Sequence, residues 1–222
     1  MPSDRHLEGK VAWITGSSRG IGHAIALHLA TLGARVAVHG SSPQSPCAFG
    51  EGTSLDDVAC AIAEASGSTV IAVCGDLTDE ARVKALADEV RSRLGPIDIL
   101  VNCAGGDIGS RGTAAPNAGK PTRNDAVFIS LEDLRTVMDR NLLTCILACR
   151  EVAPEMMERR AGRIVNIGSI AALFGHGESA IYATAKAAVH EYSRCLAMQL
   201  RPYDVAVNVV APGDTVTERF KA

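Results

Sequence analysis

Short apolar runs alternate along the chain with longer segments in which apolar residues recur at helical spacing. The runs are rich in Val, Ile and Ala without polar alternation, which is typical of strands buried on both faces of a parallel sheet. They predict six strands, at residues 10–15, 35–39, 69–74, 97–101, 163–167 and 205–210. The segments between them predict helices over residues 21–32, 54–66, 79–94, 130–160 (with a bend) and 181–201.

This alternation predicts an α/β fold: a single-domain, doubly wound parallel sheet of the Rossmann type in three layers. A length of 222 residues suits one domain over residues 1–222, and no internal repeat is visible. Right-handed crossovers would place a ligand at the carboxyl ends of the strands. Two long loops, residues 40–53 and 105–129, leave this edge, and the second is the candidate lid on the substrate side.

A glycine-rich turn, Gly16-Ser-Ser-Arg-Gly-Ile-Gly22, joins the first predicted strand to the first predicted helix. Strand, glycine turn and helix together offer free backbone N–H groups and a positive helix end to a pyrophosphate. Gly16, Gly20 and Gly22 let the chain turn sharply and let strand and phosphate approach without an intervening Cβ. The turn therefore predicts a dinucleotide site.

Tyr182 and Lys186 lie four residues apart in a predicted helix, which places the phenol and the ammonium on one face. A phenol titrates near pH ~10, and a cation fixed beside it lowers its pKa toward the working range. We therefore hypothesise that the two residues form an acid–base pair, although the spacing alone also fits an ordinary surface pair.

Several motifs occur together in a fixed order: Thr15-Gly16-x-x-x-Gly20-x-Gly22, Asn102-Cys-Ala-Gly105, Asn141, Ser169, Tyr182-x-x-x-Lys186 and Pro212-Gly213. In this order and spacing the chain resembles the short-chain dehydrogenase/reductase family from about residue 8 to its end. It looks most like the subgroup that contains 3-oxoacyl-carrier-protein reductases and sugar or polyol dehydrogenases. The substrate, acyl thioester or sugar and polyol, stays open.

The resemblance implies an oxidoreductase that transfers hydride between a nicotinamide and a ketone or secondary alcohol. Ser169 would polarise the carbonyl, and Tyr182 would exchange the proton. Lys186 would depress the tyrosine pKa and hold the nicotinamide ribose. Asn141 would distort its helix and anchor a water that leads protons toward Lys186. A non-catalytic NADP-binding regulator on the same fold is the alternative, but a regulator need not keep these residues together.

The end of the second strand bears on the choice of cofactor. It carries no Asp or Glu, the residues that hold the ribose hydroxyls of NAD. Gly40 leaves room, Ser41 and Ser42 can donate to a phosphate, and Arg19 adds a cation. We therefore expect NADP(H), with NAD(H) also possible. The resemblance implies that Asp76 binds the adenine and that Asn102, Ala104 and Gly105 line the adenine ribose. It also implies that the segment beginning at Pro212 passes over the carboxamide of the nicotinamide. The full expected cofactor set is Gly16, Ser18, Arg19, Gly20, Ile21, Gly22, Gly40, Ser41, Ser42, Asp76, Leu77, Asn102, Ala104, Gly105, Tyr182, Lys186, Pro212, Gly213, Thr215 and Thr217.

Composition is typical of a cytoplasmic enzyme. A net charge of −3 argues against a nucleic-acid surface, and no apolar run reaches membrane-spanning length. Seven cysteines form no C-x-x-C, and we interpret them as small buried hydrophobes in a reducing cytosol. The six histidines show no metal-ligand spacing, so no metal is expected.

Two departures from the family pattern lie in the C-terminal half. Gly168 stands where many relatives have a serine, and the sequence ends at Ala222, before the last helix and seventh strand of the family. We therefore expect a sheet without that strand. The resemblance implies a homodimer through residues 133–160 and 181–201, and it leaves a tetramer open because the second interface uses the seventh strand. Three cations of the second loop, Arg111, Lys120 and Arg123, could contact an anionic substrate or be merely solvated. His176 could line the substrate pocket or be a solvated loop residue.

Overall fold

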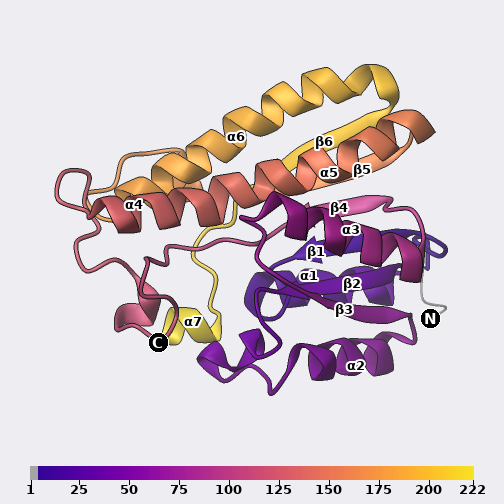
Figure 1. The fold of residues 1–222 in the computed structure, drawn as a ribbon, viewed down its shortest axis with the longest axis horizontal. Helices are drawn as coiled ribbons and strands as arrows, with labels where there is room; N and C mark the ends of the chain where they lie inside the picture. The colour runs from indigo at the N-terminus through magenta and orange to yellow at the C-terminus, as the bar shows by residue number, and fades with distance from the viewer. Residues whose placement is uncertain (1–4) are drawn as a thin grey trace.

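The computed structural model describes residues 5–222 and shows one parallel sheet with helices on both faces (Figure 1). The six strands have the order β3-β2-β1-β4-β5-β6, the doubly wound order of dinucleotide-binding folds. The predicted fold class is confirmed, and the sheet has no seventh strand within the described residues. The strand bounds are β1 Val11–Thr15, β2 Arg35–Gly40, β3 Val70–Cys74, β4 Ile99–Asn102, β5 Gly162–Ile167 and β6 Val205–Val210.

The predicted strands and long helices are all present, with ends displaced by at most two residues. The bend expected in the fourth helix is a π-helical turn between two α-helical segments. The 3-10 turns and the last helix were not predicted, because these short elements lack a periodic pattern. The helix bounds are α1 Gly20–Thr31, α2 Leu55–Ser66, α3 Glu80–Leu94, α4 Leu131–Met138, the π turn η3 Asp139–Leu143, α5 Thr144–Arg159, α6 Ala180–Leu200 and α7 Glu218–Lys221; the 3-10 turns are η1 Ser45–Phe49, η2 Asn117–Gly119, η4 Ile170–Ala172 and η5 Arg201–Tyr203.

Alternate residues of the buried central strand β1 enter two separate cores. Trp13 packs in the core shared with α3, α5 and α6. Ile14 packs in the core shared with α1 and α2 on the opposite face. Because both faces of β1 are covered, its side chains are apolar without interruption, as in parallel sheets generally. This rigid centre fixes the carboxyl edge of the sheet.

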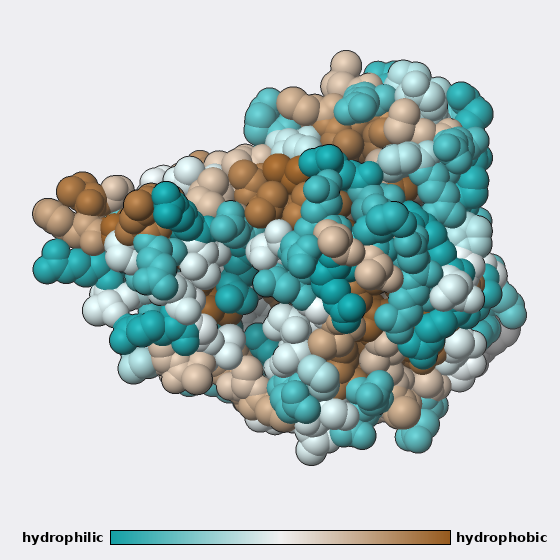
Figure 2. Space-filling view, viewed as in Figure 1, coloured by the Kyte–Doolittle hydropathy of each residue, from teal (hydrophilic) through white to brown (hydrophobic). Residues whose placement is uncertain are grey.

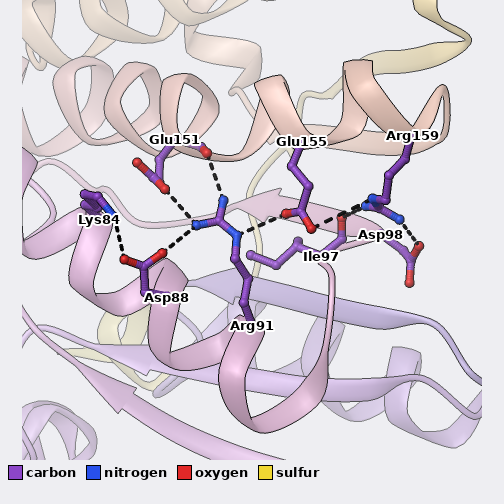
Figure 3. Close-up of polar contacts among 8 residues, drawn as sticks. All are labelled: Lys84, Asp88, Arg91, Ile97, Asp98, Glu151, Glu155 and Arg159. Carbon is purple, nitrogen blue, oxygen red and sulfur yellow. Dashed lines mark hydrogen bonds and ion pairs between the residues drawn. The ribbon is translucent and has the colours of Figure 1, made fainter.

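Half-buried ion pairs join α3 to α5 (Figure 3). The Arg91 guanidinium contacts Glu151 at 2.8 Å and Glu155 at 3.0 Å, and Arg159 contacts Asp98 at 3.0 Å. These contacts lie along one side of α5, which continues from the π turn. They help to fix the helix that presents Asn141 to the site.

The expectation that the cysteines are small buried hydrophobes is wrong for three of them. Cys145 and Cys149 are buried, whereas Cys47, Cys60 and Cys195 are exposed. Cys60 and Cys195 lie on the outward faces of α2 and α6, and Cys47 lies in η1. Among residues 5–222, no helix has the length and apolar character needed to cross a bilayer.

Candidate active site

Two glycines of the turn between β1 and α1, Gly16 and Gly22, leave no room for a Cβ. Gly16 and Gly20 have φ values of +63° and +56°, in the left-handed region that glycine adopts readily. A Cβ on Gly16 would lie 2.6 Å from the Ala104 Cα, and one on Gly22 would lie 2.3 Å from the Gly16 oxygen. The glycines therefore let α1 approach the strands closely, with its N-terminal amides at the sheet edge.

Two residues that were not predicted, His39 and Ser17, hold this turn in place through hydrogen bonds. His39, at the end of β2, accepts a hydrogen bond from Gly16 N at Nδ1 (3.1 Å), and its Nε2 lies 3.0 Å from the Gly75 oxygen. Ser17 Oγ accepts from His39 N at 2.8 Å and donates to the Ile14 oxygen at 2.7 Å. Burial lowers the pKa of His39 to about 4, so the ring is neutral at pH 7. No local pattern in the sequence indicated that the ring of His39, at the end of β2, would make these two contacts.

Thr15 ties the turn to the segment after β4. Its Oγ1 accepts hydrogen bonds from Cys103 N at 3.0 Å and from Ala104 N at 3.1 Å. The glycine turn and the segment containing Ala104 and Gly105 are thereby held side by side. Both walls of the crevice are therefore fixed by one hydroxyl.

A carboxylate from the loop after β2 sits at the N-terminus of α1. Glu51 Oε2 accepts a hydrogen bond from Gly20 N at 2.7 Å, while its Oε1 is buried without a partner among the described residues. The amides of a helix N-terminus favour anions through their unsatisfied N–H groups and the helix dipole. The contact shows that this end of α1 accepts an anionic group.

Arg19 and the serines after β2 converge on Ser45, a residue that was not predicted. The Arg19 guanidinium donates to the Ser45 oxygen and stacks on the Phe49 ring, 5.3 Å from its centroid. The hydroxyls of Ser41 and Ser42 each lie 3.4 Å from Ser45 Oγ. Burial lowers the pKa of Arg19, which the charge of Glu51 opposes. A cation and three hydroxyls thus share one corner of the crevice.

Asn141 lies in the π turn η3 and is buried. Its Oδ1 accepts from Gly106 N at 2.9 Å, and its Nδ2 donates to the oxygens of Gly106 at 2.9 Å and Val137 at 2.8 Å. The extra residue of a π turn releases backbone groups from the helical ladder, which explains why the side chain bonds the Val137 carbonyl. The helix is distorted here, as the resemblance implied.

Ser169, Tyr182 and Lys186 come together between the end of β5 and the start of α6. Ser169 lies two residues after β5, its Oγ accepts from Ala171 N at 3.1 Å, and its hydroxyl acts to lower the pKa of Tyr182. Lys186 Nζ lies 5.8 Å from the centroid of the Tyr182 ring and donates to the Ile167 oxygen at 2.8 Å. The structure therefore brings the three residues of the sequence hypothesis into one site.

The electrostatics of this pair differ from the sequence expectation. Burial raises the pKa of Tyr182, against the opposing effects of the Ser169 hydrogen bond and the charge of Arg219. Burial also lowers the pKa of Lys186, which bonds a backbone carbonyl and faces the tyrosine ring. The expectation that Lys186 lowers the tyrosine pKa is not what this structure shows, because the removal of both groups from water dominates.

The residues expected around the adenosine have mixed placements. Asp76 is exposed after β3, where it accepts from Thr78 N at 2.9 Å, and Leu77 beside it is a buried core residue. Asn102 is buried and donates to Asn166 Oδ1 at 2.9 Å and to Cys149 Sγ at 3.1 Å. Its side chain is therefore committed to the interior of the sheet, so only its backbone can line a ribose site.

The segment after β6 folds back over α1. Thr217 Cγ2 would lie 3.5 Å from a Cβ on Gly20, and Ile170 N donates to the Pro212 oxygen at 3.1 Å. Thr215 Oγ1 donates to the Gly213 oxygen at 3.1 Å. A cavity of about 530 Å³ lies between this segment and α1, with Ile21, Glu51 and Val216 in its lining.

Arg219 of α7 is a further residue near the site that sequence reasoning missed. Its Nη2 donates to the Asp107 oxygen at 2.6 Å, and its charge acts on Tyr182. The cations predicted in the loop behave differently. Arg111 bonds Thr122 within the loop, Arg123 stacks on Phe128 at 5.4 Å, and Lys120 is exposed.

The structure also shows the surroundings of Gly168 and His176 in the C-terminal half. A Cβ on Gly168 would lie 2.1 Å from His190 Nε2, so the histidine occupies the space that a serine side chain would need. His176 is exposed and packs against the Phe174 ring at 5.0 Å, as a solvated loop histidine does.

The strand order and the glycine turn are those of a doubly wound α/β dinucleotide-binding fold, and Ser169, Tyr182 and Lys186 lie together at the carboxyl edge of its sheet. Comparison with known proteins identifies the family. The sequence profile of the short chain dehydrogenase family matches residues 10–222, and the chain belongs to this short-chain dehydrogenase/reductase family.

Similar proteins differ in their named activities. The 3-oxoacyl-[acyl-carrier-protein] reductase of Escherichia coli K12 is 34% identical over 217 residues, covering 98% of this chain and 78% of the relative. Cyclohexanol dehydrogenase of Rhodococcus sp. TK6 is 37% identical over 225 residues, with 99% and 79% covered. A crystal structure of NAD⁺-bound xylitol dehydrogenase matches with a TM-score of 0.80 and 27% identity, covering 93% of this chain and 71% of that one.

Proposed function

We propose that this protein is an NADP(H)-dependent oxidoreductase that interconverts a ketone and a secondary alcohol. The observation that carries the proposal is the cluster of Ser169, Tyr182 and Lys186 at the carboxyl edge of the sheet. The Ser169 hydroxyl acts on the pKa of Tyr182, and Lys186 is buried with its Nζ 5.8 Å from the centroid of the phenol ring. This group has the donors needed to bind one carbonyl oxygen and to protonate it.

The residues present fit a dinucleotide. The N-terminus of α1 already accepts the carboxylate of Glu51 at Gly20 N, so it suits the phosphates of a dinucleotide. A side chain on Gly105 would come within 3.3 Å of Lys186 Nζ, which shows how closely the crevice wall approaches the lysine. A nicotinamide, when bound, supplies or accepts the hydride.

The protein supplies orientation and a proton. The Ser169 hydroxyl donates to the substrate oxygen and orients the carbonyl carbon toward the hydride donor. Tyr182 transfers its phenolic proton to that oxygen during reduction and takes it back during oxidation. Lys186, held by the Ile167 carbonyl at 2.8 Å, would hold the ribose hydroxyls of the nicotinamide. Asn141 keeps the wall that contains Gly106 in place through two hydrogen bonds of 2.9 Å.

The corner formed by Arg19 and the serines supports a preference for NADP(H). It contains a guanidinium and several hydroxyls but no carboxylate at the end of β2, where an acidic residue would favour NAD. Fluorescence titration with NADPH and with NADH measures the affinity for each cofactor and so the preference between them. We expect Arg19→Ala to weaken NADPH binding at least about tenfold and NADH binding much less, because one charge-assisted contact is lost.

A matched control for this titration is Arg201→Ala, an exposed arginine in η5 beyond the far end of α6. The control leaves both affinities unchanged. If wild-type protein binds NADH more tightly, or if Arg19→Ala weakens both cofactors equally, the assignment to NADP(H) is wrong.

The surface beside the site favours a substrate with an apolar body. Figure 2 shows apolar side chains gathered where α4 and α6 begin. The exposed large apolar residues of this region are Val127, Phe128, Leu131, Leu173 and Phe174. A panel of 3-oxoacyl thioesters, cyclic ketones and sugar or polyol pairs, each with NADPH and NADH, tests the function. NADPH oxidation by at least one ketone supports it, and no turnover with any member contradicts it.

A further inference from the structure

The helix that carries Tyr182 and Lys186 does not cap its own N-terminus. α6 begins at Ala180, and the residue before it, Ser179, is of a type that commonly caps a helix by accepting a hydrogen bond from a first-turn amide. Here the Ser179 side chain accepts from no such amide. The first turn, which contains Tyr182, therefore depends on partners from elsewhere in the chain.

Those partners come from the candidate lid, the loop of residues 105–129. The Asn124 backbone oxygen accepts a hydrogen bond from Ala180 N at 3.3 Å. Asp107 Oδ2 accepts from Ser179 Oγ at 2.7 Å and from Asn124 Nδ2 at 2.6 Å. We call Asp107, Asn124 and Ser179 the latch, because they join the start and the end of the loop to the first turn of α6.

The latch holds the Ser179 backbone in a conformation that this residue does not favour. Its φ of +60° and ψ of +28° lie in the left-handed region, which is unfavourable for a residue with a Cβ. A helix N-cap usually has extended backbone instead. The hydrogen bond to a buried carboxylate offsets this strain, so Ser179 relaxes when that bond is broken. The start of α6 thus has a latched and a released arrangement.

One side of the latch is fixed and the other is free to move. Asp107 is buried, and its backbone oxygen accepts from Arg219 Nη2 at 2.6 Å. The preceding residue, Gly106, is held by Asn141 through two hydrogen bonds of 2.9 Å. Asn124, in contrast, lies in a stretch of the loop that forms no helix or strand. Opening of the loop therefore withdraws Asn124 from its partners and leaves Asp107 in place.

We propose that the latch couples closure of the loop to the placement of Tyr182, with Asn124 as the positioning residue. When the loop closes, Asn124 bonds Ala180 N and the buried carboxylate, and the first turn of α6 is ordered. When the loop opens, Ser179 relaxes and the turn that carries the phenol is no longer held. Proton exchange is then confined to the closed state, in which water is excluded. This inference rests on the proposed function for its catalytic consequence.

Trypsin cleavage after Arg111 measures opening of the loop, because the exposed Arg111 bonds Thr122, two residues before Asn124. We expect Asn124→Asp to speed this cleavage at least about tenfold, because a carboxylate against Asp107 replaces a charge-assisted hydrogen bond with repulsion. Cleavage after Lys84, an exposed residue of α3, stays at the wild-type rate and shows that the fold is intact.

The matched rescue is the double variant Asp107→Asn/Asn124→Asp, which exchanges the donor and the acceptor. Its new amide group donates to the new carboxylate, and the amide oxygen still accepts from Ser179. We expect cleavage after Arg111 to return to within about threefold of the wild-type rate. Wild-type cleavage of Asn124→Asp, or rapid cleavage of the double variant, would show that these contacts do not hold the loop.

A second pair of variants tests the backbone of Ser179. Ser179→Gly and Ser179→Ala both lose the hydroxyl, but only glycine adopts the left-handed region without a steric cost. We expect cleavage after Arg111 to be at least about fivefold faster in Ser179→Ala than in Ser179→Gly. Equal rates would show that the conformation of Ser179 is not part of the latch.

Hydrogen exchange, resolved by mass spectrometry, follows the first turn of α6 without any turnover. In Asn124→Asp the amides of residues 180–183 exchange at least about tenfold faster than in the wild type, and in the double variant they recover. The amides of residues 187–200 of the same helix are the internal control and stay unchanged. Unchanged exchange at residues 180–183, together with faster cleavage of the loop, would overturn the coupling to Tyr182.

Steady-state kinetics separate this inference from the proposed function. In Asn124→Asp, kcat for the best ketone of the substrate panel falls at least about fivefold, while NADPH affinity stays within about twofold, because the turn before α1 is untouched. The double variant recovers kcat. A wild-type kcat in Asn124→Asp would overturn the coupling. If no ketone is turned over by the wild type, the proposed function fails, and the exchange of residues 180–183 still decides whether the latch orders α6.

Discussion

At the residue scale, the dinucleotide turn depends on a histidine that it does not contain. His39 fills the space beneath Gly16 and accepts its N–H at 3.1 Å, while its other nitrogen lies 3.0 Å from the Gly75 oxygen. The ring therefore joins the turn after β1 to the segment after β3. Protonation would convert the accepting Nδ1 into a donor aimed at another donor, which the folded state disfavours.

This burial predicts a pH dependence of stability. The folded-state pKa of His39 is about 4, below its ordinary value of 6.5, so the unfolded chain binds the proton more readily. The stabilisation is complete above pH ~6.5 and is lost as the pH falls toward about 4, by roughly 3 kcal/mol in total. Urea unfolding at pH 7 and pH 4.5 measures the change.

The comparison protein is His39→Gln, which has no titrating ring at this position. Its free energy of unfolding at pH 7 is lower than that of the wild type because the hydrogen bonds are less well formed. Its loss between pH 7 and pH 4.5 is smaller by about 2–3 kcal/mol. Equal losses in the two proteins would show that His39 does not titrate as described.

At the element scale, the loop between β2 and α2 occupies the end of α1. Glu51 bonds Gly20 N at 2.7 Å, and Arg19 holds the same loop through Ser45 and Phe49. The loop is therefore folded against the site that phosphates of a cofactor would use. An anionic cofactor has to displace the carboxylate before it can bind the helix amides.

This competition predicts that Glu51→Gln binds cofactor more tightly. The glutamine keeps a hydrogen-bond acceptor but loses the charge that competes at the positive end of α1. We expect NADPH and NADH to gain affinity by a similar factor of about three to ten, since both carry the same pyrophosphate. Fluorescence titration of both cofactors measures the change, with Glu64→Gln on the exposed face of α2 as the control. An unchanged or weaker affinity would show that Glu51 does not compete.

The strands and long helices were predictable because their signals are local and periodic. The apolar runs fix the strands, and the sequence around Ser54 and Ser130 marks the starts of α2 and α4, where each hydroxyl accepts from an amide at 3.1 Å. The π turn at Asn141 has no periodic signature, and it was expected only from the family resemblance. The folded structure of the loop after β2 was not predictable, since Glu51 bonds a residue 31 positions away.

At the scale of the whole molecule, the sheet order collects residues from distant parts of the chain at one edge. Gly16, Asn141, Ser169 and Tyr182 are each recognisable from a motif, and the structure places them around one crevice. Asp107 and Arg219 belong to no motif, and their contact joins residues 112 positions apart. Such contacts become visible only once the loops and α7 are folded over the sheet.

The folded structure also changes the pKa shifts expected for Tyr182 and Lys186. Spacing alone indicated that Lys186 lowers the pKa of Tyr182, because the two lie one helical turn apart. The folded protein removes both groups from water, which raises the pKa of the phenol and lowers the pKa of the amine. A sequence pattern gives the distance between two charges along a helix but not the solvation of either one.

Tyr182 is the group on which the proposed proton exchange with the substrate oxygen depends. The most direct measurement is the steady-state rate of NADPH oxidation by wild-type protein and Tyr182→Phe, with the best ketone of the substrate panel. We expect kcat to fall at least about a hundredfold, because general acid catalysis is removed while the ring is kept. NADPH affinity, titrated in parallel, stays within about threefold of the wild type, since the phenol contributes only one neutral hydrogen bond at most. Turnover close to wild type in Tyr182→Phe would show that Tyr182 is not the proton donor.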